Sequence, residues 1–112
     1  MSALLDKLRR AREFKVDTGG FSFTLRRPTD VEWLEITGQS NTARAVLPFI
    51  VGWEGVKELD LIPGGDPHPL AFDSAVCQEW LTDRIDLLPA LLDAFVKSYE
   101  GHLQARSDAA KN

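Results

Sequence analysis

The feature that most constrains this fold is a β-hairpin pattern near the N-terminus. Apolar and polar side chains alternate over residues 13–17 and again over 21–26. The turn between these two segments is Thr18-Gly19-Gly20. Alternation of this kind is typical of strands with one buried face, and glycine permits the positive φ that a tight turn needs. A lone hairpin is only marginally stable in water, so its apolar face must pack on helices or on another chain.

One helix is predicted before this hairpin and one after it. Ser2 can cap a helix that runs to about Arg12, with its leucines on one stripe and its basic residues toward the C-terminal end. Thr29 and Glu32 match a capping box, which predicts a short helix to about Thr37 that ends at Gly38. The inward side of this second helix is expected to be Val31 and Leu34, with Trp33 as a further candidate.

Two further helices are predicted in the C-terminal half. Asp73 can cap a helix over 74–83, and Asp86 can cap a long helix that tolerates Pro89 in its first turn and ends near Arg106. One face of the first of these holds Val76, Cys77, Trp80 and Leu81. The sequence therefore predicts a mostly helical α+β domain over 1–106 with one N-terminal β-hairpin, and a frayed tail over 107–112.

The middle of the chain is harder to assign. Residues 43–51 are apolar enough to form either a buried helix or a buried strand, and periodicity does not separate the two. We favour a helix that is either kinked at Pro48 or starts late, and that ends before Gly52. Residues 57–71 hold three prolines and two glycines, which indicates a long loop.

The charge of the chain is unevenly distributed. Residues 1–27 hold seven basic and three acidic residues, a net charge of +4, whereas 28–112 carry −8. The overall charge of −4 argues against a general nucleic-acid binder. The basic patch near the N-terminus is better explained as a solvated helix face, although such polarity could also let copies associate head to tail. No stretch approaches the roughly 20 apolar residues that span a bilayer, so a cytoplasmic protein is expected.

Signals for catalysis are weak throughout. Asp66 and His68 could form half of a metal site, but an exposed loop histidine is the simpler interpretation. Cys77 is the single cysteine and is expected to act as a small buried hydrophobe. No phosphate-binding loop, metalloprotease motif or nucleophile elbow occurs. We therefore expect no enzymatic activity, no catalytic residue, no metal and no cofactor.

The three tryptophans differ in their expected roles. Trp80 lies on the apolar face of a predicted helix and is expected in the core. Trp53 lies between Gly52 and Glu54-Gly55, where a glycine-flanked ring can either hold the following loop down or contact a partner. The residues alone leave both roles open.

The order of these segments resembles a known family. The hairpin ends in FTLRRPTDVEWLE, and an apolar run then leads into Val51-Gly52-Trp53-Glu54-Gly55-Val56. A polar loop with Pro69 and Phe72, a short Trp-containing helix and a long Leu/Phe/Tyr helix follow. Over about residues 21–106, this arrangement resembles the tail assembly chaperones of long-tailed bacteriophages and prophages.

The resemblance implies a non-enzymatic protein of the bacterial host cytoplasm that is absent from the finished virion. It would bind the tape-measure protein, with tail-tube subunits as further partners, and would contact neither nucleic acid nor membrane. We expect the partner-binding surface near Phe49, Trp53 and Phe72. The hairpin face is expected to serve packing or formation of a homo-oligomer, through Phe14, Phe21 and Phe23.

Two other functions remain open at the level of sequence. One is a minor tail or head–tail completion protein that stays in the virion. The other is a small DNA-binding regulator that uses the basic N-terminal helix, which would shift duplex DNA in a salt-dependent manner.

Overall fold

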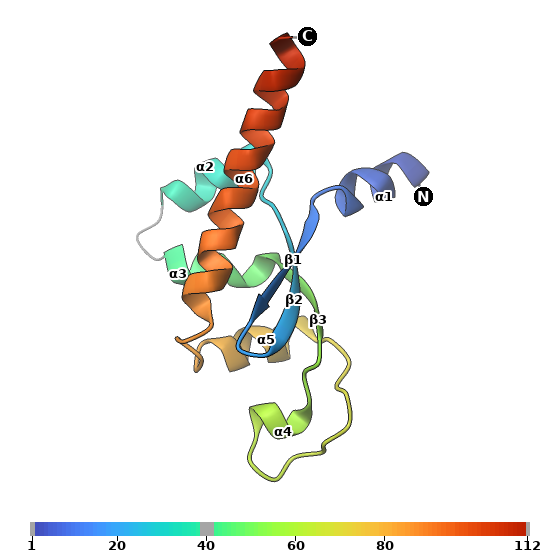
Figure 1. Ribbon diagram of the computed structural model, residues 1–112, viewed down its shortest axis with the longest axis vertical. Helices are drawn as coiled ribbons and strands as arrows, with labels where there is room; N and C mark the ends of the chain where they lie inside the picture. The colour runs from blue at the N-terminus through green and yellow to red at the C-terminus, as the bar shows by residue number, and fades with distance from the viewer. Residues whose placement is uncertain (1, 39–41, 112) are drawn as a thin grey trace.

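A computed structural model describes residues 2–38 and 42–111, and its fold is α+β, as predicted. The three strands form one antiparallel sheet in the order β1-β2-β3. The elements follow one another along the chain as α1 (Ala3–Arg10), β1 (Glu13–Thr18), β2 (Phe21–Arg26), α2 (Asp30–Thr37), α3 (Thr42–Ala45), the 3₁₀ helix η1 (Leu47–Phe49), β3 (Ile50–Glu54), α4 (Glu58–Leu61), α5 (Ser74–Leu81) and α6 (Leu88–Lys111) (Figure 1).

The predicted hairpin is present as β1 and β2. Phe21 pairs with Thr18, so that Gly19 and Gly20 alone form the turn, with φ of 62° and 86°. Positive φ at both central residues is the conformation that best matches the twist of a hairpin. A Cβ on Gly19 would collide with the side chain of Leu87, because the turn lies against the start of α6.

The predicted helix over 43–51 is wrong at its end, from Ile50 onward. The chain forms short helical turns as far as Phe49 and then enters β3, which runs through Gly52 and pairs antiparallel with β2. Pro48 fits the first turn of η1, where its missing N–H costs nothing. The residues that follow pair with the second edge of β2, whose backbone N–H and C=O groups need hydrogen-bond partners. Because β2 lies far away in the sequence, residues 43–51 alone do not reveal this pairing.

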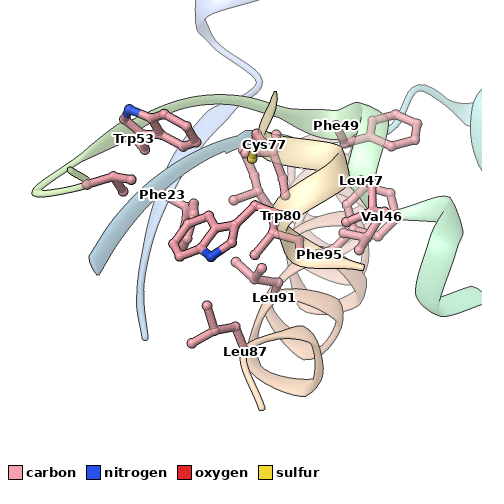
Figure 2. Close-up of a cluster of buried hydrophobic side chains, with 14 residues drawn as sticks. Phe23, Val46, Leu47, Phe49, Trp53, Cys77, Trp80, Leu87, Leu91 and Phe95 are labelled. Carbon is pink, nitrogen blue, oxygen red and sulfur yellow. The ribbon is translucent and has the colours of Figure 1, made fainter. Parts of the chain in front are cut away.

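The core lies between one face of the sheet and helices α5 and α6 (Figure 2). Phe23 and Trp53 come from the sheet, Cys77 and Trp80 from α5, and Phe95 from α6. Cys77 is fully buried, as expected, and this burial raises the pKa of its thiol to about 12. A thiol in this state is a packing group and not a nucleophile.

The capping box on α2 is confirmed, but of the three residues considered for its inward face only Trp33 lies there. The Thr29 side chain accepts from the Glu32 N–H, and the Glu32 carboxylate accepts from the Thr29 N–H. Val31 and Leu34 are 65% and 72% exposed. Trp33 faces inward instead, stacking on Tyr99 of α6 at 4.5 Å between ring centroids. Helix α2 is only eight residues long, so a single narrow stripe of it faces the core, and the large Trp33 ring lies on that stripe.

Four details of the C-terminal half also differ from expectation. The predicted loop over 57–71 contains the short helix α4. Asp86 does not act as the predicted cap, because its carboxylate accepts from Nε and Nη2 of Arg84 at 3.0 and 2.8 Å. Helix α6 continues to Lys111 where fraying was expected after Arg106, while residue 112 lies outside the described part. Val76 is partly exposed, unlike its neighbour Cys77.

Two helices extend beyond the body of the molecule. Figure 1 shows α1 pointing away from the sheet and the C-terminal half of α6 rising above it. The radius of gyration is 15.7 Å, compared with about 13 Å for a compact domain of about 100 residues. Among the described helices, none has the length and apolar content that crossing a membrane requires.

Candidate protein-binding surface

The residues predicted to contact a partner fall into two separate places. Trp53 and Phe49 are both buried, and Phe72 is half-buried against the core. The Trp53 indole donates from Nε1 to the Leu70 carbonyl at 2.8 Å, and the Phe72 ring packs edge-on against it at 5.2 Å. These contacts are those of a residue that holds the 57–71 loop to the sheet, which was one of the two roles left open for Trp53.

Phe49 lies elsewhere, beneath a groove. Its ring packs on Phe95 at 4.8 Å between centroids, and the Arg26 guanidinium lies 4.3 Å from its centroid. The hairpin aromatics pack onto the core: Phe23 is fully buried, while Phe14 and Phe21 are partly buried against it.

A groove lies above Phe49. We call it the α2–α5 groove, because α2 forms one wall, α5 the other and η1 the floor. Its volume is about 680 Å³. Its apolar surface comes mainly from Ile36, Leu47, Pro48, Phe49 and Ala75. Charged and polar groups around these apolar residues are Glu32, Glu35, Arg44, Gln78, Glu79 and Thr82.

The α2 wall of this groove is held in place by a network of charged hydrogen bonds. Arg26 of β2 donates from Nη1 and Nη2 to the two Glu32 oxygens at 2.9 and 3.1 Å. Burial opposes the charged form of Glu32, but the hydrogen bonds from Arg26 and from the Thr29 N–H outweigh it and lower the Glu32 pKa. Because Arg26 also covers Phe49, one bidentate pair fixes the sheet, the helix and the floor relative to one another.

The first turn of α2 is also tied to α6, by a second polar cluster. Asp30 accepts from the Tyr99 hydroxyl at 2.9 Å and from Arg106 Nη1 at 2.8 Å. The hydrogen bond from Arg106, followed by that from Tyr99, lowers the pKa of Asp30. The α2 wall is thus supported from the sheet by Glu32 and from α6 by Asp30.

A second groove lies on the opposite side of α5, and we call it the α4–α5 groove. Its volume is about 600 Å³. Its apolar lining comes from Leu61, Ile62, Val76 and Trp80, and its charged lining is Glu79 and Asp83. Ala75, Glu79 and Thr82 line both grooves, so the outer face of α5 forms the ridge between them.

Phe49, one of the residues predicted to contact a partner, lies in the lining of the α2–α5 groove, whereas the sequence analysis did not identify the two grooves themselves. Their residues come from α2, α3, η1, α4 and α5, which are spread along the chain. One usable signal was the outer face of α5, where Ala75, Glu79 and Thr82 recur at helical spacing.

Among the described residues, no His or Cys side chain lines either groove. His68 Nδ1 and Asp66 Oδ1 are 2.6 Å apart in the exposed loop, as an isolated pair. Within residues 2–38 and 42–111, no group of three or more His, Cys, Asp or Glu side chains could hold a metal ion. The grooves are instead open apolar surfaces edged by charge, which is the form of site that takes an amphipathic helix.

Comparison of the chain with known protein families, with curated proteins and with solved structures found no match.

Proposed function

We propose that this protein is a non-enzymatic chaperone of phage tail assembly, which binds a helical segment of the tape-measure protein in the α2–α5 groove. The observation that carries the proposal is the apolar floor of this groove, with Phe49 beneath it and charged side chains around it. The sequence resemblance supplies the identity of the partner. The chain would act in the cytoplasm of the bacterial host and leave before the virion is complete, with tail-tube subunits as a second class of partner.

The physical demands of such a chaperone fit this groove. A long amphipathic helical protein exposes apolar stripes before assembly, and these aggregate unless they are covered. An α-helix with its side chains is about 10–12 Å wide, so only one apolar stripe of a partner helix enters a groove of this kind. Each Leu-sized side chain buried there contributes about 1.5–3 kcal/mol before the costs of association are subtracted. A few such contacts give reversible binding, which a chaperone needs.

The direct test is co-expression with the tape-measure protein encoded nearby. Soluble tape-measure protein that co-purifies with this chain is the expected result. Gln78→Arg places a longer charged side chain in the α2–α5 groove, and we expect it to reduce recovery of the complex by about tenfold. Gln78 does not line the α4–α5 groove, so this variant reports on one groove only.

The matched control is Ile62→Asp, which introduces a charge in the α4–α5 groove and leaves the other groove unchanged. Thermal unfolding of both variants separates loss of binding from loss of fold. Insoluble tape-measure protein with no association would contradict the proposal. Detection of this chain by mass spectrometry in purified virions would instead indicate a structural tail protein, and a salt-dependent shift of duplex DNA would indicate a regulator.

A further inference from the structure

Helix α1 presents an apolar stripe that the rest of its own chain does not cover. Leu4, Leu5 and Leu8 are 65%, 42% and 49% exposed, and no residue of α1 is buried. The helix is nevertheless well capped, because the Ser2 hydroxyl accepts from the Leu5 N–H at 3.2 Å. A free helix of this length is marginal in water, so its stripe needs a surface to pack on.

The charges on α1 define what kind of surface that is. At about 100° per residue, Lys7 and Arg9 fall on opposite edges of the leucine stripe. Arg10 adds a third positive charge, next to Arg9 in sequence. Within the part of the chain that the structure describes, none of these three side chains has an ion-pair partner. The complementary surface is therefore apolar and flanked by free carboxylates.

The α4–α5 groove has these properties. Leu61, Ile62 and Val76 offer apolar contacts, and the charged residues among its lining are both acidic, Glu79 and Asp83. Over the described residues, neither carboxylate forms an ion pair. Arg84 lies near the Trp80 ring at 5.6 Å, but it is paired with Asp86 at 2.8 Å. The α2–α5 groove, by contrast, includes the cation Arg44 in its lining.

The helix cannot reach this groove within its own chain. Figure 1 shows α1 and α4 at opposite ends of the hairpin. The junction between α1 and β1 is also fixed, because the Arg27 N–H donates to the Arg12 carbonyl at 2.9 Å. An α1 helix that fills this groove must therefore belong to another molecule.

We propose that α1 of one copy docks in the α4–α5 groove of a second copy. The three leucines pack against Leu61, Ile62 and Val76, while Lys7 and Arg9 face Glu79 and Asp83. The contact joins two different surfaces, so each copy keeps one free helix and one free groove, and copies add head to tail into a ring or a filament. This inference does not depend on which partner fills the α2–α5 groove.

The test uses two variants of the full chain that each destroy one half of the contact. Leu5→Asp with Leu8→Asp removes the apolar stripe of α1, and Ile62→Asp with Val76→Asp removes the groove. Sedimentation velocity is expected to show concentration-dependent oligomers of the wild-type protein and about tenfold or greater weakening for each variant. Leu34→Asp, at an exposed apolar position of α2 outside both grooves, is the control and is expected to associate like the wild type.

Mixing the two variants gives the decisive result. The α1 variant retains an intact groove, and the groove variant retains an intact α1. An equimolar mixture is therefore expected to form a heterodimer that grows no further. The contact is also expected to weaken at high salt, because its charges are exposed. Gln78→Arg is expected to associate normally, which separates this proposal from the tape-measure proposal.

Three results would overturn the proposal. A wild-type chain that stays monomeric at all concentrations would do so, and so would a mixture of the two variants that remains monomeric. A monomer whose α1 leucines are required for co-sedimentation with vesicles of phosphatidylserine and phosphatidylcholine would instead show that α1 is a membrane-surface helix. Circular dichroism of each variant checks that the fold is retained.

Discussion

At the scale of single residues, Trp53 shows how one side chain can organise a long loop. Its indole N–H reaches the Leu70 carbonyl, which lies beyond α4. Trp53→Phe keeps an aromatic ring in the core but loses this hydrogen bond. We expect a decrease of about 1–2 kcal/mol in the free energy of unfolding, measured by urea denaturation. The 57–71 loop should also be cleaved faster in limited proteolysis, whereas unchanged cleavage would show that Trp53 does not hold it.

The hairpin turn offers a second comparison, between two adjacent glycines. Gly19 and Gly20 both have positive φ, so alanine is strained at either position by about 1–2 kcal/mol. Only at Gly19 would the added methyl group meet the Leu87 side chain, since nothing lies within 4 Å at Gly20. Gly19→Ala should therefore destabilise the protein by about 1 kcal/mol or more beyond Gly20→Ala. Equal unfolding free energies for the two variants would contradict this packing of the turn on α6.

Residue-level prediction succeeded where the controlling interactions are local. The Gly19-Gly20 turn and the capping box of Thr29 with Glu32 each depend on neighbours within a few positions. The position of Phe49 beneath a groove could not be predicted in detail, because it is set by Phe95 and Arg26, which lie on other elements.

At the scale of elements, helices α1 and α2 have similar N-terminal caps but pack on the body of the protein to very different extents. Thr29→Ala removes the cap of α2, whose Trp33 and Ile36 pack on the body. We expect a loss of about 1 kcal/mol in the free energy of unfolding. Ser2→Ala removes the cap of α1, which buries nothing in the monomer. At dilute protein concentration its effect on urea unfolding should stay within about 0.5 kcal/mol, and a larger loss would mean that α1 does pack on its own chain.

The prediction of the elements failed where tertiary pairing decides the structure. Residues 50–54 become a strand because β2 has a second edge to satisfy, and no local periodicity carries that information. The inward face of α2 was misassigned for a related reason, since α6 supplies Tyr99 as a stacking surface for Trp33. The outer face of α5, which divides the two grooves, was recognisable only as a polar face.

At the scale of the whole molecule, stability should depend on pH through the two carboxylates that anchor α2. The folded-state pKa values of Glu32 and Asp30 are lowered from their ordinary 4.5 and 3.8. The unfolded chain therefore takes up protons first as the pH falls. This contribution is fully present above about pH 5 and is lost as the pH falls through the folded-state values.

Urea denaturation between about pH 6 and about pH 2 measures this effect. Glu32→Gln should be less stable than the wild type at neutral pH, with a smaller further loss on acidification. Asp93→Asn, at an exposed i,i+4 pair with Lys97, is the control and should follow the wild-type curve closely. Parallel curves for Glu32→Gln and the wild type would show that the Arg26–Glu32 pair does not anchor the helix.

The α+β class followed from the sequence, whereas the overall shape did not. Amphipathic helices around one hairpin are enough to define the class. They do not define how far α1 and α6 extend, because the extended parts of these helices lie outside the core. The same is true of the grooves, which exist only once α2, η1, α4 and α5 have been brought together.

Amide hydrogen exchange tests the central claim most directly, comparing the free chain with its complex with the tape-measure protein. The proposal predicts slower exchange in α2, η1 and the C-terminal half of α5, which surround the α2–α5 groove, with Gln78→Arg losing this protection. Exchange in α4 should stay unchanged at concentrations where the chain is monomeric. Protection confined to other surfaces, or equal protection in Gln78→Arg, would contradict the account.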